Sequence, residues 1–159
     1  MIQILSVLFA FVVVVLGQLY LAPLLSFARI HPDFILVLLV YLAARKGRVW
    51  GISFGFAAGL LQDFTGAFSV LGANALAKSV AGYSLGTLNG TETVWTSRIV
   101  NIYIYGSIAG HALIYEIVMS RGLEESMATL LARILVQIFI SSMLVMGTRF
   151  ILPLLGDKI

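Results

Sequence analysis

Charge and cysteine are both scarce in this chain. Only 11% of its 159 residues are Asp, Glu, Lys or Arg, whereas about 25% is usual for a soluble domain. There is no cysteine, so disulfides, thiolate nucleophiles and thiolate metal sites are excluded. No basic stretch is longer than Arg45-Lys46-Gly47-Arg48, and we expect no nucleic-acid partner. Too little charge remains to cover a soluble surface.

Apolar residues take the place of the missing charge. They make up 60% of the chain, and the mean hydropathy is +1.05. Soluble domains are only about 45–50% apolar. We therefore predict an all-α, polytopic membrane protein in which residues 1–159 form a single transmembrane domain. Such a domain leaves no room for a soluble catalytic domain.

Apolar runs separated by short polar loops predict six transmembrane helices. Their approximate ranges are 2–22, 33–44, 49–62, 71–88, 98–120 and 127–155. The first run exceeds the apolar core of a signal peptide and no Lys or Arg precedes it, so we expect a retained helix. The second and third runs reach the roughly 17–20 residues of a membrane span only with their flanks. We take both as full spans, and a re-entrant hairpin is the alternative.

Basic residues predict the orientation, because Lys and Arg in short loops concentrate on the cytoplasmic side. With the N-terminus inside, the cytoplasmic segments hold Arg45, Lys46, Arg48, Arg98, Arg149 and Lys158. The outer segments hold Arg29, Arg121 and Arg133. This asymmetry favours a multi-pass protein with both termini in the cytoplasm.

Small residues recur every four positions on three of the predicted helices. Residues four apart share one helix face, and a face of small residues lets membrane helices approach closely. We therefore predict helix packing at Gly51, Gly55, Gly59, Gly82, Gly86, Gly106 and Gly110. A homodimer face is the alternative to packing within one chain.

Five ionisable residues on five helices fall at a similar depth, in the outer half of the predicted bilayer. A lone charge there costs roughly 2.5–3.5 kcal/mol on insertion scales. We therefore predict two ion pairs, Lys78 with Asp63 and Arg133 with Glu116. The whole predicted polar centre comprises Asp33, Asp63, Asn74, Lys78, Glu116, Arg133 and Gln137.

Three interpretations of this polar centre remain open. In the first, buried pairs fix the helix register and do nothing else. In the second, they line an outward-open cavity for a lipid head group or a partner's polar side chain. In the third, each charge reaches the interface without a partner. His111 shares a four-residue spacing with Ser107 and Tyr115, and we expect it to be a hydrogen-bonded packing residue rather than a ligand.

The sequence does not predict a catalytic site. We find no Gly-x-Gly-Asp or His-Glu-x-x-His motif, no phosphate loop and no Gly-x-Gly-x-x-Gly, and we expect no nucleophile elbow. The acidic residues are scattered singly, so no metal site and no cofactor is expected. The chain is therefore predicted not to be an enzyme.

One stretch of the chain combines several specific features. They are Pro32-Asp33 ahead of an apolar helix with Tyr41, Gly59-Leu60-Leu61-Gln62-Asp63, Leu71-Gly72-Ala73-Asn74-Ala75-Leu76-Ala77-Lys78-Ser79, Gly82-Tyr83 and Gly86. In this combination the stretch from His31 to Gly86 resembles the MreD family, the multi-pass component of the bacterial rod-shape machinery. The length and the helix count are similar to that family over the whole chain.

The resemblance implies a non-enzymatic scaffold in the bacterial cytoplasmic (inner) membrane. Its implied partner is MreC, a single-pass protein with a periplasmic domain. Directly or through MreC, the scaffold would support peptidoglycan synthesis by a RodA-type glycosyltransferase and a class B transpeptidase, with MreB filaments as an indirect partner. The resemblance also implies the six-helix fold of the substrate-binding components of energy-coupling-factor transporters.

That fold defines the alternative function, a small-molecule-binding membrane subunit of a transporter. Such subunits often carry two alanines four residues apart on the first helix, where the transport module docks. Ala10 has no second alanine four residues further on, which argues against this function.

Overall fold

The chain folds into helices joined by short connections. The computed structural model describes residues 2–25, 30–65, 70–91, 95–121 and 126–151. These residues form α1 (Ile2–Leu24), α2 (Phe34–Lys46), α3 (Arg48–Thr65), α4 (Ala73–Leu85), a 3-10 helix η1 (Gly86–Leu88), α5 (Ser97–Met119) and α6 (Met127–Ile151). No strand occurs in these ranges, so the predicted all-α class is confirmed.

The predicted helix boundaries agree with the structure to within a few residues. The largest difference in the middle of the chain is at α3, which was expected to end at 62 and continues to Thr65. The expected range 71–88 divides into α4 and the tighter turn η1. The part of the sixth expected helix beyond residue 151 lies outside the described residues.

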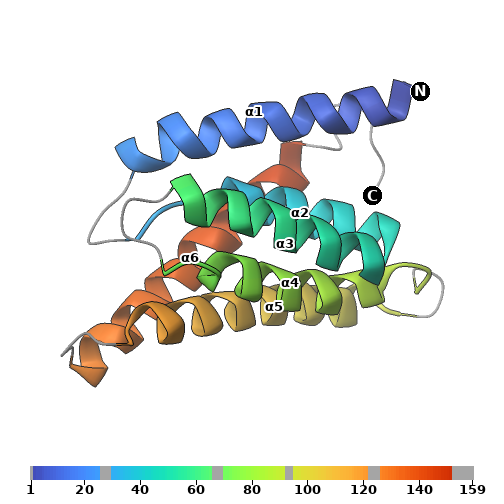
Figure 1. Ribbon diagram of the computed structural model, residues 1–159. Coiled ribbons are helices and arrows are strands. Elements are labelled where there is room, and N and C mark those ends of the chain that lie inside the picture. The colour runs from blue at the N-terminus through green and yellow to red at the C-terminus, as the bar shows by residue number, and fades with distance from the viewer. Residues whose placement is uncertain (1, 26–29, 66–69, 92–94, 122–125, 152–159) are drawn as a thin grey trace.

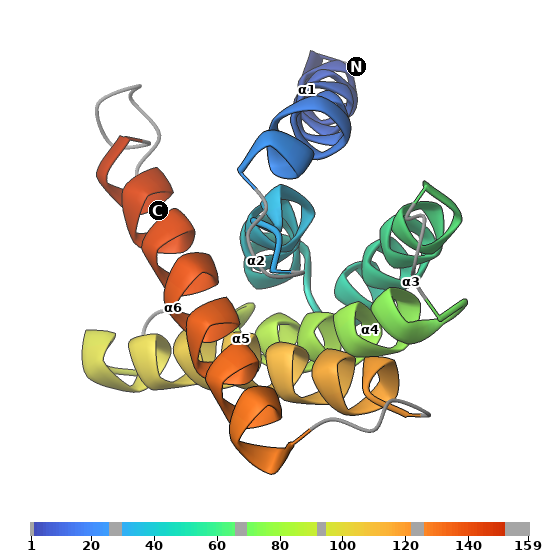
Figure 2. The ribbon, with the colours of Figure 1, turned by 90° about the vertical axis from the view of Figure 1, so that its left-hand side faces the viewer.

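α2 is the central helix of the bundle. It contacts α1, α3, α4 and α6, and Figure 2 shows α3 and α6 on opposite sides of it. In Figure 1, α1 lies along one edge while α6 crosses the other helices obliquely. The apolar core forms around α2, and it includes Leu39 of α2, Leu85 of α4, Ile108 of α5 and Val145 of α6.

Among the described helices, α3 and α4 pack the most closely. The glycines of α3 lie directly against the backbone of α4, so that a Cβ at Gly55 would lie 2.5 Å from the Lys78 carbonyl oxygen. A Cβ at Gly59 would lie 2.6 Å from the Ala75 Cα, and one at Gly51 would overlap the backbone of Gly82. The predicted packing role of the glycines on α3 and α4 therefore agrees with the geometry, because only a residue without a side chain fits there.

α2 is short and begins inside the molecule. Its 13 residues span about 20 Å, less than the ~30 Å hydrocarbon core of a bilayer. The segment leading into it is buried at Ile30, Pro32 and Asp33, and a helix N-terminus is thereby placed in the interior. Gln18 of α1 holds this entry, since its Nε2 donates to the Pro32 oxygen at 3.2 Å and its Oε1 accepts from the Phe34 N–H at 2.9 Å.

The turn between α2 and α3 depends on one glycine. Gly47 has a φ of +91°, a backbone conformation that side chains disfavour, and its N–H closes α2 by donating to the Ala43 oxygen. The Asn89 side chain donates to the Arg45 oxygen at 2.5 Å. The chain after η1 is thereby tied to the α2–α3 turn.

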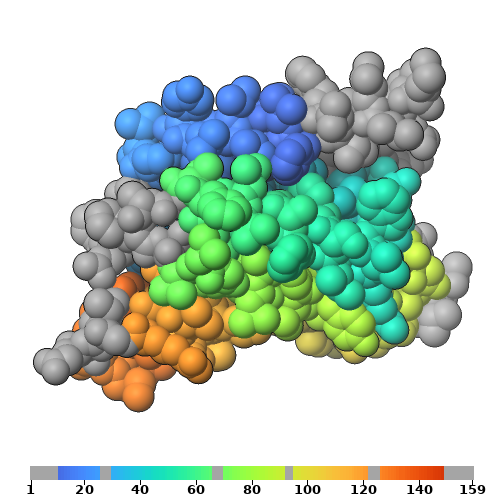
Figure 3. Space-filling model, in the orientation of Figure 1, coloured from blue at the N-terminus to red at the C-terminus, as the bar shows by residue number. Residues whose placement is uncertain are grey.

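The surface of the protein is apolar and its interior holds charges. Leu24 is 80% exposed, Val49 76% and Met146 67%, whereas Lys78 is 0% exposed. Figure 3 shows α3 and α4 forming one continuous surface beneath α1. By length and composition, two of the described helices could cross a membrane, at Ser97–Met119 and Met127–Thr148.

Candidate functional site

An ion pair at the N-terminus of α2 forms the middle of the site. The Lys78 Nζ on α4 lies 2.5 Å from the Asp33 Oδ2, and both side chains are buried. Asp33 is also the N-cap of α2, because its Oδ1 accepts from the Leu36 N–H at 2.9 Å. Lys78 donates further to the Asn74 Oδ1 at 3.1 Å. One carboxylate thus caps a helix and neutralises a buried ammonium group.

The predicted partner of Lys78 was wrong. Asp63, near the end of α3, accepts from the backbone N–H groups of Gly72, Asn74 and Ala75 at 2.9, 3.1 and 3.2 Å. It also accepts from the Asn74 Nδ2 at 2.9 Å. Asp63 therefore serves as the N-terminal cap of α4, where the first N–H groups lack helical partners and the helix dipole favours negative charge. Asp33 takes its place beside Lys78.

Removing the Asp63 carboxylate should loosen the α3–α4 connection. We expect Asp63→Ala to lower the free energy of unfolding by about 1–3 kcal/mol, because buried N–H groups at the start of α4 lose their charged acceptor. Asp63→Asn should cost less, since one amide oxygen remains to accept. Reversible unfolding in mild detergent, followed by circular dichroism, measures both. Equal costs for the two variants would contradict the capping role.

The second predicted ion pair is confirmed. The Arg133 Nε on α6 lies 3.5 Å from the Glu116 Oε2 on α5, and the two side chains are 12% and 4% exposed. Gln137, one turn further along α6, is also buried, and its Nε2 donates to the His31 oxygen at 3.4 Å. The polar face of α6 is therefore turned into the protein, as its four-residue spacing predicted.

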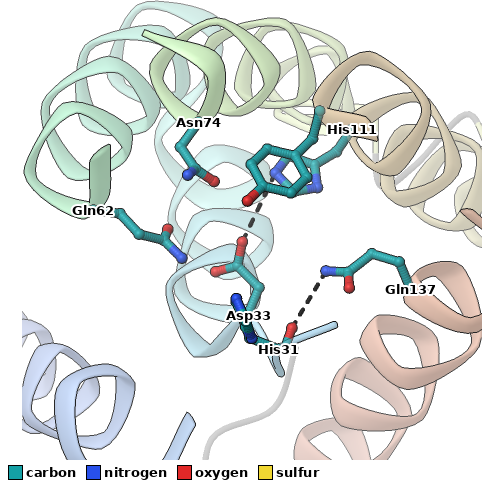
Figure 4. Close-up of a pocket in the computed structure, with 7 residues that line it drawn as sticks. His31, Asp33, Gln62, Asn74, His111 and Gln137 are labelled. Atoms are coloured by element: carbon teal, nitrogen blue, oxygen red, sulfur yellow. Dashed lines mark hydrogen bonds and ion pairs between the residues drawn. The ribbon is translucent and has the colours of Figure 1, made fainter. Parts of the chain in front are cut away.

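A small cavity lies beside the Asp33–Lys78 pair. It has a volume of about 20 Å³ and is lined by His31, Asp33, Gln62, Asn74, His111, Tyr115 and Gln137. Figure 4 shows these side chains converging from several helices around the N-terminus of α2. Three residues of the predicted polar centre, Asp33, Asn74 and Gln137, therefore share one cavity.

Several residues of the site were missed by the sequence reasoning. His111 was expected to be a hydrogen-bonded packing residue, yet its Nε2 lies 3.8 Å from the Asp33 Oδ2, and its ring is stacked with that of Tyr115 at 6.3 Å. Gln62 follows directly before Asp63 and lines the same cavity. Gln18 lies deep in the apolar helix α1, whose other glutamine, Gln3, is at the N-terminal end, and that isolated position was the signal for its role.

The glycines of α5 do not pack as predicted. A Cβ at Gly106 or Gly110 would meet no atom of the described chain within 4 Å. Both line an open groove of about 310 Å³ between α4 and α5, bordered by Val80, Ser84 and Ile102 among others. The four-residue spacing was correct as a face of α5, but no helix within the described ranges covers it.

The described residues contain no arrangement typical of a hydrolase or a metal enzyme. The letters Gly-x-Ser-x-Gly occur at 51–55 and 82–86, but the first lies within α3 and the second runs from α4 into η1. A nucleophile elbow requires a sharp turn between a strand and a helix. No group of three or more His, Asp or Glu residues in the described ranges could hold a metal ion.

Buried ion pairs, a helix N-terminus in the interior and exposed apolar side chains together define a helical membrane protein. A family model described as rod shape-determining protein MreD matches residues 1–152 of the chain. The chain belongs to the MreD family, and the family resemblance seen in the sequence is confirmed. No curated protein and no solved structure matches the chain. Membership implies a role in determining rod shape, in a family of structural components rather than known enzymes.

Proposed function

We propose that this protein is a non-enzymatic scaffold of the rod-shape complex in the bacterial inner membrane. It binds MreC and supports peptidoglycan synthesis by a RodA-type glycosyltransferase and a class B transpeptidase, while MreB filaments are an indirect partner. The observation that carries the proposal is the family match over residues 1–152. The geometry supports it, because the buried polar side chains are used to hold helices together.

Recovery of the partner tests this function. We expect the tagged protein, purified from the bacterium in mild detergent, to retain a single-pass MreC-like protein. A Gly55→Leu variant is the control, since the α3–α4 contact leaves no space for its side chain and MreC should be lost with the fold. Recovery of an ATPase module or of a bound vitamin in place of MreC would contradict the scaffold function.

The cavity size argues against the transporter alternative. The cavity in the polar centre, at about 20 Å³, is close to the size of one water molecule, whereas small-molecule sites usually enclose about 300–1,000 Å³. The groove of about 310 Å³ between α4 and α5 reaches that size, but it is open rather than enclosed. We nevertheless propose the helix arrangement of the substrate-binding components of energy-coupling-factor transporters for the single domain of residues 1–159. An experimental structure superposed on such a component tests that arrangement.

We also propose six membrane spans with both termini in the cytoplasm. The absence of cysteine makes this directly measurable, because each introduced cysteine is the only thiol in the chain. The α2–α3 turn and the end of α5 should lie on opposite sides of the membrane. In spheroplasts, an impermeant maleimide should label Arg121→Cys and should label Lys46→Cys only after permeabilisation. The side chains of Lys46 and Arg121 are both exposed, so a lack of labelling cannot result from burial within the protein. Labelling of both cysteines from outside would refute the topology.

A further inference from the structure

The cavity beside α2 is bordered by polar atoms that lack hydrogen-bond partners within the described part of the chain. They are the Gln62 Oε1 and both ring nitrogens of His111. The 3.8 Å between the His111 Nε2 and the Asp33 Oδ2 is too long for a direct hydrogen bond. A buried polar atom left in this condition is costly, so something other than a neighbouring side chain must satisfy it.

The cavity has the size and the chemistry of a water site. Its volume of about 20 Å³ exceeds the roughly 10–15 Å³ that one water needs, and it excludes larger molecules. Water can donate to the amide oxygen of Gln62 and can also hydrogen-bond to an imidazole nitrogen. A bare cation is disfavoured there, because it would be repelled by the Lys78 ammonium group, which lies 2.5 Å from Asp33.

We propose that this cavity binds one ordered water molecule, which donates to the Gln62 Oε1 and hydrogen-bonds to a ring nitrogen of His111. The water joins α3 to α5 across the N-terminus of α2. The water also lies beside His111 and Asp33, whose side chains are too far apart for a direct hydrogen bond. This internal site is independent of the scaffold function, since it depends only on the interior of the fold.

Direct observation is the first test. An experimental structure at a resolution that shows ordered water should contain one density peak about 2.7–3.2 Å from both the Gln62 Oε1 and a His111 nitrogen. The proposal is overturned if the Gln62 or His111 side chain is instead turned onto a protein partner. It is equally overturned if the peak has several oxygen ligands at about 2.4 Å, the geometry of a cation.

A matched pair of substitutions supplies the second test. Gln18 has two hydrogen bonds from its amide to protein groups, so Gln18→Met shows the cost of losing a satisfied amide. With water bound, Gln62→Met should also lower the melting temperature, by about 2–4 °C for each hydrogen bond lost. Without it, the substitution removes an unsatisfied buried oxygen. In that case Gln62→Met should melt at or above the temperature of the unaltered protein. This result would overturn the proposal.

Discussion

Replacing Lys78 with methionine should lower the free energy of unfolding by about 3–5 kcal/mol, the cost of breaking a buried pair by removing one partner. Lys78 is fully buried and the Asp33 carboxylate beside it is 4% exposed. Methionine fills similar space, so the loss comes from the uncompensated charge rather than from a void. Chemical unfolding in mild detergent measures the change.

Two double variants identify the partner of Lys78. Asp33→Asn removes the negative charge while keeping a side chain that caps helices well. Adding it to Lys78→Met should therefore restore part of the lost stability, with a coupling of about 1–3 kcal/mol. Adding Asp63→Asn to Lys78→Met should restore nothing, because Asp63 is the cap of α4. If Asp63→Asn restored stability to Lys78→Met and Asp33→Asn did not, the pairing of Lys78 with Asp63 expected from the sequence would be the true one.

Gly55→Ala should disrupt the fold even though it adds a single methyl group. The new Cβ would lie 2.5 Å from the Lys78 carbonyl oxygen and 2.8 Å from its carbonyl carbon. Both are backbone atoms, so α3 and α4 must move apart along their whole contact. We expect a loss of at least about 3 kcal/mol, at the upper end of overpacking effects. The yield of monodisperse protein and its melting temperature report this loss.

Gly110→Ala is the matched control for that experiment. It is also a glycine at four-residue spacing within a helix, but its Cβ would meet no described atom within 4 Å. Alanine favours helix by about 1 kcal/mol over glycine, so stability should stay equal or rise. If Gly55→Ala and Gly110→Ala behaved alike, the tight α3–α4 contact would not exist in the protein.

Residue spacing predicted the helix faces well. Stretches of apolar residues indicated all six helices, and the four-residue spacing of Gly51, Gly55 and Gly59 indicated the side of α3 that packs closely. The Arg133–Glu116 pair was also predictable, because α5 and α6 are consecutive and antiparallel, so depth alone brings the two charges together. Local spacing suffices where neighbours in sequence are neighbours in space.

Spacing failed where contacts depend on which helices meet. Asp63 was the expected partner of Lys78 because the two residues fall at a similar depth, but the free N–H groups of α4 compete for the same carboxylate. Asp33 reaches Lys78 only because α2 begins in the interior of the bundle. The face of Gly106 and Gly110 was identified correctly, yet sequence spacing carries no information about whether another helix covers it.

The all-α class, the membrane character, the family and the close face of α3 and α4 were all evident from the amino-acid sequence. These follow from composition and from the helical repeat, which act along the chain. The packing of the helices was needed to show that Asp33 both caps α2 and neutralises Lys78, and that His111 and Gln62 border one small cavity. Contacts around this cavity join residues as many as 106 positions apart, and they depend on helix packing that no local pattern encodes.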